Sequence, residues 1–179
     1  MKNIGRSNKN TRTDLVLTED AGLNELFAQA NGYSLRPSED NSGHEVCFKN
    51  ELVAHCFKQH EFYHFLKKTY NIDWKNYLTR ELFPDNGLFV AIRDTLFIID
   101  IRPQRSKWFG DWKLQTCDFK RKQYMKLVHS LGWRVEYVYV LSDWFRKPKY
   151  RDVLDYIHSV NCHYMFNTIP LKWFGLPDA

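Results

Sequence analysis

Two acidic residues stand where strands are expected to begin and end. Asp85 follows a proline at the entry to the apolar run Leu88–Ile92, and Asp100 follows a second apolar run, Thr95–Ile99. A two-residue link between the runs predicts a hairpin in the middle of a covered sheet. The start of the first strand then lies beside the end of the second. We therefore expect Asp85 and Asp100 to be neighbours.

Two carboxylates held this close repel each other unless a cation lies between them. A hard divalent cation such as Mg²⁺ takes oxygen ligands at about 2.0–2.1 Å and keeps several waters. Alternation along a strand puts Asp100 and Arg102 on one face, so a guanidinium would stand beside the ion and attract a phosphate. The Ile101 carbonyl is a further candidate ligand. The sequence thus predicts a metal site at Asp85 and Asp100.

The segments Pro84-Asp85 and Asp100-Ile101-Arg102 resemble the motif of PD-(D/E)XK nucleases, which place Pro-Asp before one strand and an acid, any residue and Lys on the next. The resemblance runs from roughly Glu51 to the end, and Gln104 lies two residues past the Lys position, as in several restriction-enzyme-like proteins. It implies an α/β fold with a restriction-endonuclease-like core, in which helices flank a central mixed β-sheet.

The same resemblance implies Mg²⁺-dependent hydrolysis of phosphodiester bonds in double-stranded DNA, with Mn²⁺ as a substitute. Asp85 and Asp100 would be ligands, and Glu51, as an acid of the first helix, would complete the ligand set. A restriction-type enzyme of this size implies a homodimer or a second nuclease subunit, because one site cuts one strand.

Arg102 stands where the family has lysine. Lysine can bind the attacking water and share a proton, whereas arginine stays charged to above about pH 12 and stabilises charge only. Electrostatic stabilisation of the transition state and a metal-bound water of lowered pKa remain available. Three functions are therefore open: a DNA endonuclease, a weakened or inactive nuclease-fold subunit that holds DNA or a partner, and a nuclease that acts on RNA or on branched DNA.

Each candidate acid also has a structural interpretation. Asp85 fits a turn in Pro-Asp-Asn-Gly, and Asp100 fits an ion pair with Arg102 or Arg105, since a buried carboxylate without a partner is costly. Glu51 fits the first turn of a helix, where an acid complements the helix dipole.

Basic and aromatic residues interleave between positions 102 and 126, a composition that suits phosphate neutralisation and contacts to base edges. A solvated helix face is the alternative for any single lysine. A second basic cluster, Arg146, Lys147, Lys149 and Arg151 around Trp144, is expected to flank the same groove. The predicted DNA contacts are Gln104, Arg105, Lys107, Lys113, Gln115, Lys120, Arg121 and Lys122.

A zinc site is a competing interpretation of a different segment. Cys56, His60 and His64 recur every four residues on an expected helix, with His44 and Cys47 just upstream. Zinc takes such ligands. Ordinary packing of these side chains is the alternative, since they overlap the apolar stripe of that helix.

The elements that position these residues follow from hydrophobic periodicity. A loop is expected at residues 32–43. Helices are predicted at 20–30, 50–70, 73–82, 119–131 and 150–160, and strands at 88–92, 95–99, 135–141 and 163–166.

Length and composition indicate one domain. The chain has 179 residues, 44% of them hydrophobic, which suffices for one core at residues 14–179 behind a polar, basic arm at 1–13. A net charge of +5 favours a polyanionic partner only modestly. Four cysteines without a C-x-x-C pair and no apolar signal segment lead us to expect free thiols in the cytoplasm. No apolar run approaches the roughly 20 residues of a membrane span.

Overall fold

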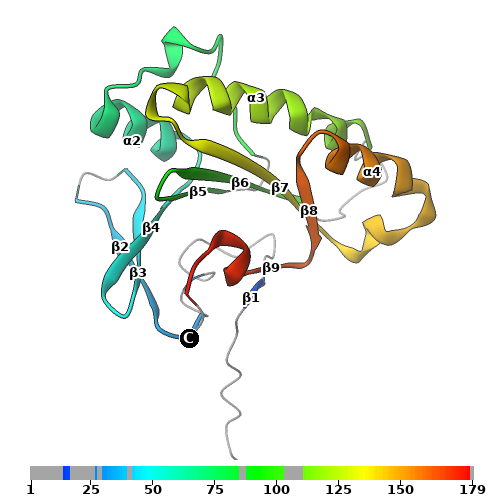
Figure 1. The fold of residues 1–179 in the computed structure, drawn as a ribbon, viewed down its shortest axis with the longest axis horizontal. Helices are drawn as coiled ribbons and strands as arrows, with labels where there is room; N and C mark the ends of the chain where they lie inside the picture. The colour runs from blue at the N-terminus through cyan, green and yellow to red at the C-terminus, as the bar shows by residue number, and fades with distance from the viewer. Residues whose placement is uncertain are drawn as a thin grey trace, which may run out of the picture.

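The structure is a computed structural model, and it describes residues 14–16, 27, 30–39, 42–84, 88–102 and 111–177. Within these residues a mixed seven-stranded sheet dominates, with the strand order β2-β3-β4-β5-β6-β7-β8 (Figure 1). An α/β fold with a central mixed sheet is therefore confirmed. The strands are β2 (Tyr33–Pro37), β3 (His44–Phe48), β4 (Glu51–Phe57), β5 (Leu88–Ile92), β6 (Thr95–Arg102), β7 (Arg134–Leu141) and β8 (His163–Phe166).

The kind of strand pairing changes once across the sheet, from antiparallel to parallel. Neighbours from β2 to β6 pair antiparallel, whereas β6 pairs with β7, and β7 with β8, in parallel. The predicted hairpin is confirmed, and its second strand continues to Arg102, because the parallel register with β7 runs on to the pair Arg102↔Leu141. All eight residues of β6 are buried. This central strand carries the acid-x-base tripeptide at its carboxyl end.

Three α-helices among the described residues cover one face of the sheet: α2 (His60–Tyr70), α3 (Cys117–Val128) and α4 (Arg151–Ser159) (Figure 1). Their apolar sides and the upper face of the sheet form one core. None of the described helices is both long and apolar enough to cross a bilayer. Short 3-10 turns connect the elements: η1 (Trp74–Asn76), η2 (Asp111–Thr116), η3 (His129–Leu131), η4 (Asp143–Arg146) and η5 (Pro148–Tyr150).

The C-terminal segment lies against the other face. Strand β9 (Thr168–Pro170) pairs antiparallel with β1 (Asp14–Val16), and η6 (Leu171–Phe174) follows directly. Figure 1 shows these pieces below the sheet, opposite the helices. A second core forms here from alternate residues of β5, β6 and β7 together with Ile169, Leu171 and Phe174.

The predicted helix at 50–70 is wrong in its first part. Residues Glu51–Phe57 form β4, and α2 begins only at His60. Lys49 and Asn50 have φ angles of 48° and 71°, so they make the tight turn between β3 and β4. Asn50, where the predicted helix begins, is thus a hairpin residue. Pairing with β3 and β5 overrides a local pattern that suits a helix.

Other boundaries shift for similar reasons. The expected loop at 32–43 contains β2, which pairs along its whole length with β3. The helix predicted at 73–82 shortens to η1, although Asp73 does cap it through the Lys75 backbone N–H at 3.1 Å. The helix predicted at 20–30 and the arm at 1–13 lie largely or wholly outside the described residues. Helix α3, which begins two residues early, and β7, α4 and β8 agree with the predictions.

Candidate active site

Asp100 and Arg102 end the central strand β6 with their side chains on the helix-covered face. Alternation along β6 puts Leu96 and Ile98 in the core under the helices, and Ile99 and Ile101 in the core on the opposite face. Asp100 and Arg102 follow Leu96 and Ile98 at the same spacing of two residues, so they lie on the helix-covered face. The predicted common face is therefore confirmed. The two residues are 0% and 1% exposed, so a carboxylate and a guanidinium are buried together.

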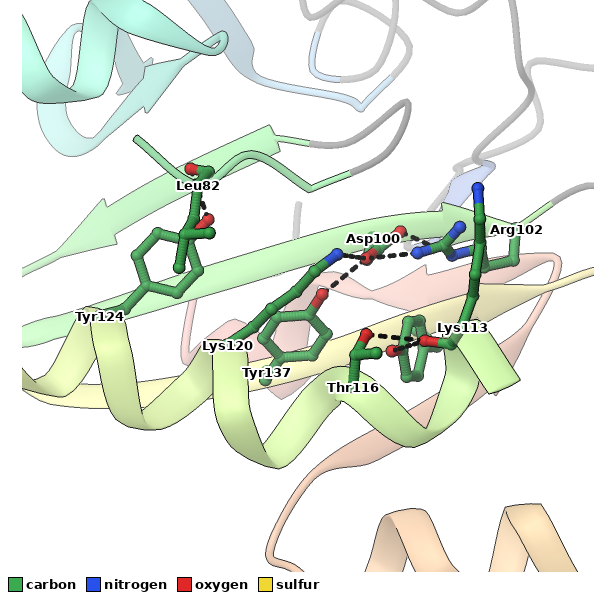
Figure 2. A network of polar contacts seen from close by, with 9 residues as sticks. Leu82, Asp100, Arg102, Lys113, Thr116, Lys120, Tyr124 and Tyr137 are labelled. Carbon is green, nitrogen blue, oxygen red and sulfur yellow. Dashed lines mark hydrogen bonds and ion pairs between the residues drawn. The ribbon is translucent and has the colours of Figure 1, made fainter. Parts of the chain in front are cut away.

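The two side chains form an ion pair. Arg102 Nε lies 2.9 Å from Asp100 Oδ1, and Arg102 Nη2 donates a hydrogen bond to Asp100 Oδ2 at 3.1 Å (Figure 2). A buried carboxylate is tolerated only when charges or donors compensate the lost hydration. Of the two ion-pair partners expected for Asp100, Arg102 is the one that the structure shows. Arg105, the other possible partner, lies outside the described residues.

Two further donors reach the same carboxylate. Lys120 Nζ from α3 lies 3.4 Å from Asp100 Oδ2, and the Tyr137 hydroxyl from β7 donates to that oxygen at 2.5 Å (Figure 2). Burial, together with the negative charge of Asp100, raises the pKa of Tyr137 well above its ordinary value, so the phenol stays a neutral donor. Asp100 is the centre of a buried polar cluster built from β6, β7 and α3.

Among the described side chains of the cluster, positive charge exceeds negative charge. Arg102 and Lys120 both contact the carboxylate of Asp100, so these three side chains carry a formal excess of one positive charge. Since charges act strongly in a medium of low dielectric constant, such a cluster attracts an anion such as a phosphate. The Lys120 side chain is 15% exposed, so the cluster reaches solvent through this lysine.

Tyr139 connects the cluster to η2. Arg102 Cζ lies 5.6 Å from the centroid of the Tyr139 ring, and the Tyr139 hydroxyl donates to the Lys113 carbonyl at 3.0 Å. Thr116 Oγ1 donates to the same carbonyl at 2.8 Å. These contacts hold η2, with Lys113 and Gln115, at the edge of the sheet where β6 ends.

The chain that leads into Pro84-Asp85 is anchored at Leu82. Its carbonyl accepts hydrogen bonds from the hydroxyls of Tyr63 on α2 and Tyr124 on α3, each at 2.7 Å. Figure 2 shows the contact with Tyr124 beside the Asp100 cluster. Asp85 itself, the predicted second carboxylate, lies outside the described residues, as do Gln104, Arg105 and Lys107.

Glu51 is not part of this cluster. It is the exposed first residue of β4, not a residue of a first helix, and the opposite end of β4, Phe57, pairs with Phe89. A seven-residue strand spans about 20 Å. The Phe57 end of β4 is the one that lies near the carboxyl end of β6, with β5 between them. Glu51 is at the other end of β4. Ile101 points its side chain into the opposite core and is paired with Val140 of β7.

The expected DNA contacts on α3 divide into three environments. Lys120 contacts Asp100, and Arg121 Nε donates to the Val135 carbonyl of β7 at 3.0 Å. Lys122 is exposed and pairs with Asp118 one turn away at 2.8 Å, as expected of a solvated helix face. At η2, Gln115 is exposed.

The second basic cluster lies at the same edge of the sheet. The backbone N–H of Ser142 donates to the Arg102 carbonyl at 3.2 Å, and η4 and η5 with their basic residues follow at once. Lys149 and Gln115 line a common hollow of about 500 Å³ between η2 and α4. Both predicted basic segments therefore border the carboxyl ends of β6 and β7.

The geometry behind the zinc interpretation is not present. Cys56 is in β4, while His60 and His64 are in α2, so the three residues do not share a helix. His60 Nδ1 pairs with Glu81 at 2.7 Å. In the part of the chain that the structure describes, no group of three or more His, Cys, Asp or Glu side chains is arranged to hold a metal ion.

Sequence reasoning missed the roles of Lys120 and Tyr137 in the cluster, although weak signals existed. Positions 117, 120, 124 and 127 recur at helical spacing, and Cys117, Tyr124 and Leu127 are buried, so Lys120 lies on the inner side of α3. Tyr137 and Tyr139 share one face of β7 because strands have a period of two. Only the register between β6 and β7 identifies Asp100 as their neighbour.

Comparison of the chain with protein-family models, with curated proteins and with solved structures found no match in any of the three.

Proposed function

We propose that this chain is a Mg²⁺-dependent DNA endonuclease of restriction-enzyme type, built on a restriction-endonuclease-like core. The observation that carries the proposal is the convergence of Asp100, Arg102 and Lys120 at the carboxyl end of a central strand. The tripeptide Asp100-Ile101-Arg102 lacks the amine of the usual lysine. Lys120 supplies an amine from α3, beside the Asp100 carboxylate. The mixed sheet with helices against it is compatible with the proposed core.

A divalent ion at Asp100 has one strict requirement. Both carboxylate oxygens contact cationic side chains, and Arg102 in particular approaches both of them. The described residues therefore accommodate an ion only if Arg102 releases Asp100, with Asp85 as the proposed second ligand. Bound there, the ion would supply a water of lowered pKa.

The roles of the side chains follow from their chemistry. Arg102 stays charged and would stabilise the negative charge of the phosphate in the transition state. Lys120 can share a proton, so it would orient the attacking water and balance its charge. The basic residues of η2, η4 and η5 border this edge and would contact the DNA backbone. Cutting both strands would take a homodimer or a second nuclease subunit.

A second candidate is a nuclease-fold subunit that binds double-stranded DNA without cutting it. The observation that favours it is the Arg102–Asp100 ion pair, because an arginine that holds both oxygens competes with a metal for them. Both candidates use the same basic edge, so DNA binding alone does not separate them.

Nicking of supercoiled plasmid with Mg²⁺ or Mn²⁺ tests the first candidate. We expect the wild type to nick, and Asp100→Asn and Lys120→Ala to lower the rate by about 10²–10⁴-fold. Lys67→Ala is the control, since Lys67 is an exposed lysine of α2 that pairs with Asp73 and is not one of the predicted DNA contacts, and we expect it to keep the rate. Circular dichroism confirms that each variant is folded.

Two further variants address Arg102. Arg102→Lys restores the usual residue of the motif, whereas Arg102→Ala removes the charge. If neither the wild type nor Arg102→Lys nicks DNA with either ion, the endonuclease proposal is wrong. Salt-dependent DNA binding in a mobility-shift assay would then support the binding subunit.

A further inference from the structure

A second site candidate lies on the opposite face of the sheet from Asp100. A hollow of about 460 Å³ opens at the amino ends of the parallel strands, where Thr95, Arg134 and His163 are the first residues of β6, β7 and β8. Residues of η6 and Gly175 form its other wall. Small-molecule sites occupy about 300–1,000 Å³, so the hollow has the size of a ligand pocket.

The charges that line this hollow are unbalanced. Among the described residues that line it, the cations are Arg93, Arg134 and Lys172 and the acids are Asp94 and Glu136, so these five side chains carry an excess of one positive charge. The acids are already engaged: Arg134 Nη2 lies 3.7 Å from Asp94 Oδ1, and His163 Nε2 lies 3.0 Å from Glu136 Oε2. The excess charge favours an anionic ligand.

The rim that carries these cations is held in place by hydrogen bonds. The backbone N–H of Arg134 donates to the Asp94 carbonyl at 2.8 Å, and Arg134 Nη2 donates to Thr95 Oγ1 at 3.2 Å. Arg93 has a φ of 51° in the tight turn between β5 and β6. The hydrogen bond to Thr95 restrains the Arg134 side chain, and a restrained donor loses less freedom on binding, which favours affinity.

A flat aromatic surface adjoins the cations. The Trp173 indole lines the hollow, and its position is set by edge contacts with Phe97 and His163, whose ring centroids lie 5.3 and 5.5 Å away. Such a surface offers apolar contact or stacking to a planar ring. Lys172 and Trp173 are adjacent in η6, so charge and ring surface occur side by side.

We propose that this hollow binds a small organic anion that has both a phosphate group and a planar ring, of the size of a nucleoside monophosphate. Arg93, Arg134 and Lys172 receive the phosphate, and Trp173 contacts the ring. The site is separate from the Asp100 cluster, which lies on the other face of the sheet and at the other end of β6.

Isothermal titration of the full chain with AMP, adenosine and inorganic phosphate tests the proposal. We expect AMP to bind, and adenosine and phosphate each to bind at least about tenfold more weakly, because each lacks one half of the recognised structure. Lys172→Ala and Arg93→Ala should each weaken AMP binding by about tenfold, as expected for loss of a charge-assisted contact.

Arg151→Ala is the matched control. Arg151 is an exposed arginine of α4, in the basic cluster on the helix-covered side, and its removal should leave AMP binding unchanged. Binding of AMP that responds to Arg151→Ala but not to Lys172→Ala would overturn the proposal, as would no AMP binding at all. Equal affinity for AMP and adenosine, or for AMP and phosphate, would also overturn it.

This experiment does not depend on DNA cleavage. Asp100→Asn abolishes the proposed nuclease chemistry and leaves every residue of the hollow intact, so this variant should bind AMP like the wild type. Loss of nicking with retained AMP binding separates the two proposals.

Discussion

Arg102 holds Asp100, its second neighbour on the same strand, by both carboxylate oxygens, and both residues are buried at the end of β6. Residues two apart on a strand point the same way, so the pair forms within one element. Among the described residues outside the strand, Lys120 and Tyr137 contact Oδ2. Of these three described partners, Arg102 is the one that approaches both oxygens.

Removal of either member of this pair should destabilise the fold strongly. We expect Arg102→Met, and separately Asp100→Leu, to lower the free energy of unfolding by about 3–5 kcal/mol, because each takes from a buried charge its ion-pair partner on the same strand. The double variant Asp100→Leu/Arg102→Met should lose clearly less than the sum of the two. Urea denaturation of the four proteins measures this, and strictly additive losses would show that the pair is not coupled.

Tyr137 and Tyr139 offer a matched comparison on one strand. Tyr137→Phe removes a hydrogen bond to the charged Asp100 and should cost about 1.5–3 kcal/mol of stability, whereas Tyr139→Phe removes one to the neutral Lys113 carbonyl and should cost about 1 kcal/mol. Chemical denaturation of both variants gives the two values. Equal losses would mean that the charge of Asp100 adds nothing to its contact with Tyr137.

Stability should fall in alkaline solution. Burial, and then the charge of Asp100, raises the pKa of Tyr137 and of Tyr139 above the ordinary value of 10.0. Above pH 10.0 the unfolded chain therefore binds fewer protons at these two tyrosines than the folded chain does. The stability that the neutral phenols contribute is complete below pH 10.0, and it is lost as the pH rises toward the folded-state pKa values.

Urea midpoints measured between about pH 8 and pH 11 test this dependence. The double variant Tyr137→Phe/Tyr139→Phe should decline less steeply with pH than the wild type. Tyr70→Phe, which removes an exposed hydroxyl, should decline as the wild type does. A wild type whose midpoint does not change over this range would contradict the prediction.

Gly43 should tolerate substitution less well than Gly132. Both have positive φ, 94° and 68°. A Cβ at Gly43 would lie 2.5 Å from the Cys56 carbonyl oxygen, whereas one at Gly132 meets no described atom within 4 Å.

Gly132→Ala therefore carries only the backbone cost of about 1–2 kcal/mol, and Gly43→Ala adds a clash with β4. Thermal denaturation should show the larger drop in midpoint for Gly43→Ala. A smaller drop than for Gly132→Ala would mean that the turn before β3 relaxes freely.

The sequence by itself determined the central hairpin, α3, β7, α4 and β8. In each, the apolar residues are dense or periodic enough to define one element, and Gly132 ends the helical region after α3 with a φ of 68°. Alternation in β6 likewise puts Asp100 and Arg102 on one face, independently of any tertiary contact. Local patterns suffice where a single periodicity is compatible with the residues.

Only the tertiary structure decided that residues 51–57 form a strand and that Asp100 meets Lys120 and Tyr137. The strand β4 is stabilised by ladders to β3 and β5, which local propensity does not contain. Lys120 and Tyr137 follow Asp100 by 20 and 37 residues, and they reach it because α3 crosses back over the sheet and β7 pairs in parallel with β6. The register of that pairing depends on packing across the whole core, so the partners of a buried charge emerge only when the chain is folded.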